Sequence, residues 1–338
     1  MRKFFNKLIY WGNLLAAFLL LISFILPYLP PKNFPTISLL SLVVSVLIIV
    51  NIIFAIYWAV QFRRRFFISF VMLFISYFYF NVFYEMSSDG DASKYKNTLN
   101  VLSYNVRLFN AYEKNPATDS KKIISEILTE EKPDVVCIQE YYKPNTIDFS
   151  MYPYQYIHFK SEKAKLGHAI FSKYPLANTG AFDFEDTYNN TLYTDVVKGV
   201  DTIRIYSVHL QSLGIIPRVS FLQDSDNEKL RKRVSSAFEK QQKQVEDILV
   251  HKQKTTHPII ICGDFNNTPF SYSYRKLKHG MQDAFRERGN GLGTTFEFEK
   301  YPMRIDYIFA SEELEVLSFE TMKKTFSDHY AIRATVGW

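Results

Sequence analysis

The segment PIIICGDFN, residues 258–266, gives the clearest indication of the fold. Four consecutive apolar residues follow its proline, a pattern typical of a strand that is buried on both faces. Two polar side chains, Asp264 and Asn266, come directly after this predicted strand. A single aspartate or asparagine in such a place is usually a turn residue. A role in chemistry therefore requires other strands that end in the same way.

Five other predicted strands carry polar side chains at one end. They are Asn105 after 99–104, Glu140 after 135–139, His209 at the end of 202–209, Asp306 near the start of 305–310, and Asp328 and His329 before 331–336. Strand ends in a layered sheet project into one crevice. The six groups can therefore converge on a single site.

The order of elements after residue 98 predicts an α/β domain. Helices are expected at 120–130 and 228–251, the second with apolar residues at helical spacing. Strands outnumber these helices, and several neighbouring strands look antiparallel. We therefore expect two mixed sheets packed together and flanked by helices, over residues 98–338. The polar residues 87–97 are interpreted as a linker.

The segment 214–227 has no clear periodicity but is rich in apolar residues. They are Ile215, Ile216, Val219, Phe221 and Leu222. Such a loop is typical of a lid or of a membrane contact. A loop packed on its own domain is the alternative.

The first quarter of the chain has the composition of a membrane domain. Residues 1–84 contain no Asp or Glu, and three stretches within them, 8–31, 33–62 and 66–84, carry no charge at all. About 20 apolar residues suffice to cross a bilayer as a helix. We predict three transmembrane helices, at about 8–29, 36–61 and 66–84, in a membrane domain of residues 1–86.

Two other interpretations of this quarter were weighed. A cleaved signal peptide would need a cleavage site after the first apolar stretch, and no convincing one follows it. A soluble helical bundle would need helices with a polar face, which none of the three has.

The basic residues predict the orientation of these helices. Arg2, Lys3 and Lys7 precede the first helix, and residues 63–65 are three arginines between the second and third helices. Lys and Arg collect on the cytoplasmic side. The N-terminus is then cytoplasmic, and residues 98–338 lie outside the cytoplasm. For a bacterial protein this means the inner membrane, with the C-terminal part in the periplasm.

The net charge does not indicate nucleic-acid binding by itself. The chain carries 40 Lys and Arg against 34 Asp and Glu, but seven of the basic residues fall in the membrane quarter, where there is no acid. The remaining 254 residues are nearly neutral. The two cysteines cannot form a disulfide framework, and no C-x-x-C zinc motif is present.

Six short motifs, in order along the chain, resemble those of the endonuclease/exonuclease/phosphatase superfamily. They are Ser103-Tyr104-Asn105, Ile138-Gln139-Glu140, Ser207-Val208-His209-Leu210, Gly263-Asp264-Phe265-Asn266, Arg304-Ile305-Asp306-Tyr307 and Ser327-Asp328-His329. The resemblance covers residues 99–336. It implies a four-layer α/β sandwich with two central mixed sheets, the DNase I-like fold, and hydrolysis of phosphoester bonds.

The resemblance also implies roles for the motif residues. Glu140 is expected to be the main metal ligand, with Asn105 beside it and Asp328 adding a carboxylate. Such oxygen ligands suit Mg²⁺ or Mn²⁺. The remaining five residues would be catalytic. His329 would act as general base or clamp the phosphate, Asp306 would orient His329, Asp264 and Asn266 would position water and phosphate, and His209 would protonate the leaving oxygen or bind the phosphate.

These observations predict a membrane-anchored, Mg²⁺-dependent phosphodiesterase that acts outside the cytoplasm. Its partners would be the lipid bilayer and a phosphoester substrate, either a phospholipid or sphingolipid headgroup or nucleic acid, with no obligate protein partner. A tethered nuclease for DNA or RNA is one alternative. A non-catalytic scaffold that keeps the fold is another, although all six motifs are intact.

Overall fold

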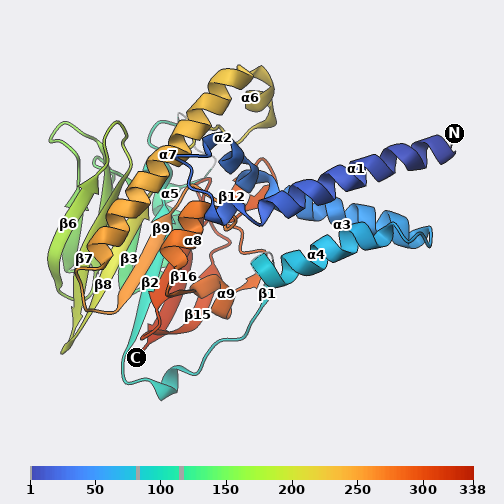
Figure 1. The fold of residues 1–338 in the computed structure, drawn as a ribbon. Coiled ribbons are helices and arrows are strands. Elements are labelled where there is room, and N and C mark those ends of the chain that lie inside the picture. Colours follow the sequence, from blue (N-terminus) through green and yellow to red (C-terminus); the bar gives the residue numbers. More distant parts are fainter. Residues whose placement is uncertain (1, 81–83, 114–117) are drawn as a thin grey trace.

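A computed structural model describes residues 2–80, 84–113 and 118–338. Two six-stranded sheets pack face to face, and helices cover their outer faces (Figure 1). Helix α5 (Ser120–Glu131) lies on the first sheet, and helix α7 (Asn227–Lys252) lies on the second. The prediction of an α/β fold with two mixed sheets is confirmed.

The first sheet has the order β15-β16-β2-β3-β5-β4. Its strands are β15 (Glu315–Thr321), β16 (Ile332–Gly337), β2 (Thr98–Asn105), β3 (Val135–Tyr142), β5 (Leu166–Ser172) and β4 (Tyr154–His158). The central pair β2 and β3 is parallel, and the other pairs are antiparallel. The parallel pair requires a crossover connection, which α5 provides.

The second sheet repeats this pattern with the order β10-β14-β9-β8-β7-β6. Its strands are β10 (Met281–Asp283), β14 (Asp306–Ser311), β9 (Ile259–Asp264), β8 (Asp201–His209), β7 (Asn190–Lys198) and β6 (Leu176–Asp183). Here β8 and β9 form the parallel pair, joined by α7. Side chains from both sheets fill the core between them, including Val101, Ile205 and Ile260.

Shorter elements lie around the sheets. Strand β1 (Glu85–Met86) pairs with β11 (Asn290–Gly291), and β12 (Phe296–Phe298) pairs with β13 (Tyr301–Met303). Helices α8 (Tyr272–Lys278) and α9 (Ala284–Arg288) follow β9 and β10. The apolar segment 214–227 contains a short helix, α6 (Val219–Asp224).

The N-terminal quarter forms helices α1 (Arg2–Ser23), α2 (Pro35–Ser38), α3 (Val44–Val60) and α4 (Phe66–Phe80). Two segments, Lys3–Tyr28 and Pro35–Val60, are long and apolar enough to cross a membrane. Three such helices were predicted. The third, α4, has 15 described residues, which is shorter than the about 20 needed. Residues 81–83 of the predicted third helix lie outside the described part of the chain.

Buried polar side chains connect the three long helices. The Ser69 hydroxyl of α4 lies 2.6 Å from Asn13 Oδ1 of α1 and 2.9 Å from Asn51 Oδ1 of α3. The Asn51 side chain also donates to the carbonyl of Leu47. Interhelical hydrogen bonds of this kind hold apolar helices together where lipid surrounds them. Helix α4 is therefore part of the same bundle as α1 and α3.

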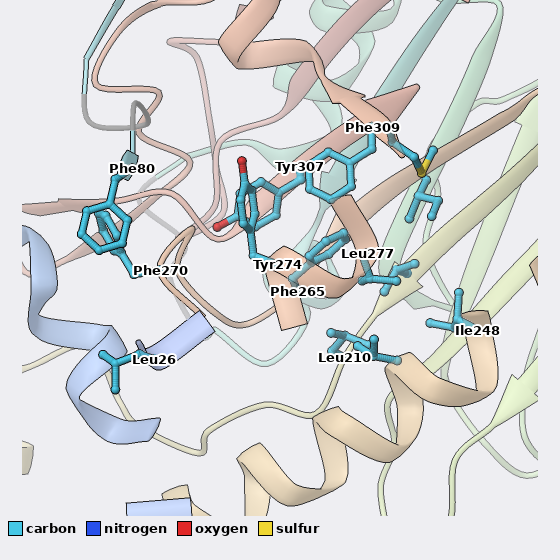
Figure 2. Packing of buried hydrophobic residues seen from close by; sticks show 14 of the residues in the cluster. Leu26, Phe80, Leu210, Ile248, Phe265, Phe270, Tyr274, Leu277, Tyr307 and Phe309 are labelled. Carbon is cyan, nitrogen blue, oxygen red and sulfur yellow. The ribbon is translucent and has the colours of Figure 1, made fainter. Parts of the chain in front are cut away.

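One end of this bundle packs against the C-terminal part of the chain. Figure 2 shows Phe80 of α4 beside Phe270, with ring centroids 4.7 Å apart, and Leu26 at the margin of the same cluster. The Arg275 guanidinium of α8 lies 4.0 Å from the ring centroid of Tyr28. The helices and the sheets therefore share one apolar core at this end.

Candidate active site

The four parallel strands carry four of the predicted residues at their carboxyl ends. Asn105 ends β2, Glu140 lies near the end of β3, His209 ends β8 and Asp264 ends β9. The carboxyl ends of parallel strands are the usual place for a ligand site in an α/β sheet. Because the two sheets pack face to face, both parallel pairs end at the same crevice.

Antiparallel neighbours bring the remaining residues to this crevice. Strand β14 starts where β9 ends, so that Asp306 lies opposite Asp264 in register. Strand β16 starts where β2 ends, and Asp328 and His329 immediately precede it. All eight predicted residues therefore come from the strand ends or loops around one point.

Asp264 is the most enclosed carboxylate of the site. It is 1% exposed and accepts hydrogen bonds from the Asn266 amide at 2.7 Å, from Asn105 Nδ2 at 3.0 Å and from Asn266 Nδ2 at 3.2 Å. Burial is the largest influence and raises the pKa of Asp264 to about 7, although His329 opposes this rise. Three of its roughly four lone pairs are occupied.

The backbone before Asp264 requires glycine. Gly263 has φ +132°, and a Cβ at this position would lie 2.0 Å from the carbonyl oxygen of Val208. The parallel strands β8 and β9 can therefore approach closely beside the site.

His329 and Asp306 form a buried pair. The Nδ1 atom of His329 lies 3.0 Å from Asp306 Oδ2, and its Nε2 atom lies 3.7 Å from Asp264 Oδ2. Burial opposes a charge on the ring, but the carboxylates of Asp306 and Asp264 outweigh it and raise the pKa of His329 to about 10. His329 is therefore a cation held in one orientation.

His209 lies between two carboxylates without a hydrogen bond to either. Its Nε2 atom is 3.8 Å from Glu140 Oε1 and 3.7 Å from Asp264 Oδ2. Burial, followed by the nearby rings of His168 and His329, lowers its pKa well below the usual value. A neutral ring here offers one N–H hydrogen-bond donor and one acceptor nitrogen.

Glu140 presents its carboxylate at the edge of the crevice. Its backbone has φ 54°, and the pairing of β3 with β5 shifts register at this point. The side chain is 28% exposed and has one long hydrogen bond, 3.4 Å from Asn105 Nδ2. Burial raises the pKa of this carboxyl group. A bulge that re-aims a side chain is common beside active sites.

Asp328 lies farther out than the other acids. Its carboxylate is 30% exposed, and Oδ2 is 3.9 Å from Nε of Arg107. The hydroxyl of the neighbouring Ser327 donates to the carbonyl of Asn105 at 2.8 Å, which fixes this loop to the end of β2.

Comparison with known proteins identifies this arrangement. A model described as the Endonuclease/Exonuclease/phosphatase family matches residues 102–329. The chain belongs to this family. It is an enzyme that hydrolyses phosphoester bonds. A second model, described as a domain of unknown function, matches residues 6–83. No curated protein matches the sequence.

Solved structures of the Endonuclease/Exonuclease/phosphatase family share the fold. The chain is similar to an endonuclease/exonuclease/phosphatase from Beutenbergia cavernae, with 17% identity, a TM-score of 0.53 and 72% of each chain covered. A Bacteroides vulgatus structure of the same description has 16% identity and a TM-score of 0.52, over 71% of this chain and 99% of the other. The human Nocturnin catalytic domain with a bound sulfate anion has 18% identity and a TM-score of 0.52, over 71% and 94%.

Enzymes of this family generally depend on a divalent metal ion, and the crevice holds a buried group of the right chemistry. Ligand atoms of Asp264, Asp306 and His329 lie within 4.8 Å of one another. Glu140, Asn105 and Asp328 offer a second, more open set of oxygens.

Two residues outside the six motifs, Gln241 and Thr295, support the catalytic loops. Gln241 of α7 donates to the carbonyl of Gln211 at 2.8 Å and accepts from Asn267 Nδ2 at 2.7 Å. The Thr295 hydroxyl accepts from the backbone amides of residues 305 and 306, both at 3.0 Å. A glutamine on the buried face of an amphipathic helix was the available signal for Gln241.

Arg304 belongs to a motif but points away from the chemistry. Its guanidinium donates to Asp283 at 2.8 Å and lies 4.6 Å from the ring centroid of Phe285. Tyr274 donates to the same carboxylate at 2.7 Å. Arg304 therefore stabilises the start of β14 rather than contacting a phosphate.

A chain of polar side chains connects the two sheets beneath the site. His168 of β5 lies 2.7 Å from the Ser207 hydroxyl of β8 and 2.9 Å from Asn190 Oδ1 of β7. Gln139 of β3 donates to Ser207 at 3.1 Å and to Ser103 at 3.2 Å. Burial lowers the pKa of His168 to about 4, so the ring is neutral in this network.

Proposed function

We propose that this protein is a membrane-anchored, Mg²⁺-dependent phosphodiesterase that acts outside the cytoplasm on a lipid headgroup or on nucleic acid. One observation carries the proposal. Two imidazoles and four carboxylates meet at the carboxyl ends of two parallel strand pairs, in a protein of a phosphoester-hydrolysing family.

We assign the metal to Glu140, with Asn105 and Asp328 beside it. The carboxylate of Asp264 already accepts three hydrogen bonds, and the ring of His329 is committed to Asp306. Glu140 has one long hydrogen bond, and burial raises the pKa of its carboxyl group, so its oxygens lack partners that a cation would supply. An all-oxygen set fits Mg²⁺ or Mn²⁺ better than zinc. When bound, the ion polarises the phosphoryl oxygen and neutralises developing charge.

The remaining residues are assigned to water, phosphate and leaving group. A water oxygen attacks phosphorus, and Asp264 takes the proton of this water with its remaining lone pair. His329, kept cationic by Asp306, clamps the phosphate oxygens, so its raised pKa favours this role over that of general base. Asn266 positions the phosphate. Neutral His209 donates a hydrogen bond from its ring N–H to a phosphate oxygen, and the leaving ester oxygen takes up a proton from solvent water.

The test of activity uses the full-length protein in detergent with Mg²⁺ and bis(p-nitrophenyl) phosphate. Asp264→Asn and His329→Ala are expected to lower kcat by about 10² to 10⁴-fold. Glu239→Gln, a change of an exposed acid on α7, is the matched control and keeps full activity. Wild-type rates in the Asp264→Asn variant would contradict the site. No hydrolysis of this diester, DNA, RNA or phospholipid by the wild type would favour the scaffold alternative.

Three features support a membrane location for the N-terminal helices. Two of them have spanning length. The outward faces of α1, α3 and α4 are apolar, with Phe18, Ile53 and Phe74 each more than half exposed. Ser69 ties α4 to the other two helices. We propose that α4 crosses the bilayer with them, although its described part is short.

The position of the basic residues supports the orientation. The Arg65 guanidinium lies over the ring of Tyr10, and Tyr57 donates to Asn6, so the N-terminus and residues 63–65 are at one end of the bundle. The two sheets are at the other end (Figure 1). Under the positive-inside rule this arrangement directs the catalytic part out of the cytoplasm.

Cysteine labelling of intact cells tests the orientation. Val200, in the turn after β7, and Phe62, in the basic loop, are both almost fully exposed, whereas the natural Cys137 and Cys262 are buried. With a membrane-impermeant maleimide and an opened outer membrane, Val200→Cys should react and Phe62→Cys should not. The reverse pattern would put the catalytic part in the cytoplasm.

A further inference from the structure

A chamber of about 920 Å³ runs from the catalytic residues to the start of α3 and the segment just before it. At one end it is lined by Glu140, Asp264, Asn266 and His329. Its other lining residues are mostly apolar. The volume is that of a site for a whole small ligand, at the upper end of the usual range of about 300–1,000 Å³.

The first wall of the chamber belongs to a candidate membrane span. Leu39, Leu42, Val43 and Val46 line it, and all four lie within the segment Pro35–Val60. Val43 and Val46 remain about two-fifths exposed, so they face the chamber without a protein partner that covers them. The apolar surface of the bilayer-facing helix thus continues into the active site.

The facing walls come from the α/β domain, residues 98–338. Leu222 lies on α6, Leu230 and Val234 lie on α7, and Phe296 and Met303 lie on the β12–β13 hairpin. Figure 1 shows α2 and α6 near the same end of α7. The segment 214–227, whose apolar residues suggested a lid or a membrane contact, therefore forms a side of this chamber.

We infer that the chamber binds the hydrocarbon chain of a lipid phosphoester whose phosphate lies at Glu140 and His329. The inference rests on the proposed function and names its substrate class. A chain that enters along α3 would stay in contact with apolar surface as it leaves the bilayer, while its phosphate would reach the polar end. Among the described residues that line the chamber, only Arg107 and Arg231 are permanently cationic. A nucleic acid would require a continuous basic groove instead.

The test is the dependence of hydrolysis on chain length. The full-length protein in detergent with Mg²⁺ is given p-nitrophenyl phosphate diesters that carry an ethyl, butyl, octyl or dodecyl chain. All of them release p-nitrophenol from the same kind of bond. We expect kcat/KM to rise about threefold to fourfold for each buried methylene until the chamber is filled. A flat series, or cleavage of nucleic acid with no effect of chain length, would overturn the inference.

A matched pair of variants separates the chamber from detergent effects. Val46→Trp fills the chamber, whereas Ile53→Trp adds the same ring to an outward face of the same helix. The ratio of dodecyl to ethyl kcat/KM should fall at least tenfold in Val46→Trp and stay unchanged in Ile53→Trp. Partition of long chains into detergent is the same for both proteins. Equal ratios in both would contradict a chain site beside α3.

A measurement without turnover distinguishes failure of this inference from failure of the proposed function. Val46→Cys is labelled with a maleimide in the presence of dodecylphosphonate or ethylphosphonate, with Val200→Cys as the control. If only the dodecyl compound slows the labelling of Val46→Cys, a binding site for the chain in the chamber is supported even when no diester is hydrolysed. Equal labelling with both compounds overturns the inference even if short diesters are hydrolysed.

Discussion

The two sheets of this protein have the same plan but different surroundings. Each has a parallel pair at its centre, joined by a crossover helix that covers the outer face. Helix α5 has 12 residues and buries Ile124, Ile127 and Leu128 against its own sheet. Helix α7 has 26 residues, contacts α2 and hydrogen-bonds to the catalytic loops through Gln241. Both sheets therefore place site residues at the ends of their parallel strands. The half that contains α7 also contributes the side chains that hold the catalytic loops and one side of the chamber.

The residues assigned to the reaction are also divided between the two sheets. Under the proposed assignment, the first half contributes Asn105 and Glu140 from its parallel pair as oxygen ligands for a metal. The second half contributes Asp264 for proton transfer, Asp306 to orient His329, and His209 to bind the phosphate. If this division holds, variants of the two halves should fail in different ways.

The largest effects on activity should come from variants of Glu140 and Asp264, which test metal binding and proton transfer separately. Glu140→Ala should raise the Mg²⁺ concentration for half-maximal rate by tenfold or more, because it removes the main ligand. Asp264→Asn should lower kcat by about a thousandfold with little change in that concentration. Metal titration of initial rates measures both. Identical metal curves for the two variants would remove the proposed division.

The two crossover helices should respond differently to substitution. Gln241→Leu leaves the Gln211 carbonyl and Asn267 without their partner and should lower activity about tenfold through the catalytic loops. Ile127→Ala should cost about 2–4 kcal/mol of stability, because it opens a cavity under α5. The activity of its folded fraction should be normal. Thermal unfolding in detergent and rate per folded protein are the measurements.

The buried hydrogen bonds of His168, Ser207 and Gln139, which connect the two sheets, should make the stability of the fold decrease in acid. The pKa of His168 is lowered from about 6.5 to about 4 in the folded state, so the unfolded chain binds the proton first as pH falls. Its contribution is fully present above pH 6.5 and is lost as pH falls toward 4, by about 3 kcal/mol. In His168→Asn this part of the pH dependence should disappear. Melting temperatures at pH 7 and pH 4.5 test it, and equal slopes in both proteins would contradict it.

The smallest effect is expected for exposed ion pairs on the two crossover helices. Lys324 contacts Glu126 and Glu130 of α5, and Lys232 contacts Glu228 on α7. All are exposed, and solvent screens such pairs. Lys324→Ala and Lys232→Ala should both leave melting temperature and activity unchanged within error. A clear loss in only one would reveal a role for that helix surface.

The sequence predicted best the parts of the fold that are buried on both faces. Strands β2, β3, β8 and β9 were found within a few residues of their ends, because most of their residues are buried and each contains a run of apolar residues. Edge strands β4 and β6 were missed, since about half of their residues are exposed and their pattern is weak. Helix α6 was not expected in the segment 214–227, where periodicity over six residues is too short to recognise.

The sequence predicted the site residues that belong to the motifs. It did not predict the contacts that hold the catalytic loops in place. All eight predicted residues meet at one crevice, because each is fixed to the end of a buried strand. Gln241 lies outside the motifs, and Thr295 lies in the loop before one of them; only the folded chain shows that their side chains hold the catalytic loops. The chamber was not foreseen either, since its walls come from residues 39–46, 212–234 and 296–305, which only the folded chain brings together.

Phe80 packs against Phe270, and Tyr28 packs against Arg275. The N-terminal helices are therefore fixed to the sheets rather than joined to them by a flexible linker. In a bilayer the active site would then stay at a fixed height above one leaflet. Substrate would arrive by lateral diffusion within that leaflet, so the search would be two-dimensional. Turnover in vesicles should follow the surface density of the substrate and be insensitive to its total concentration in the bulk.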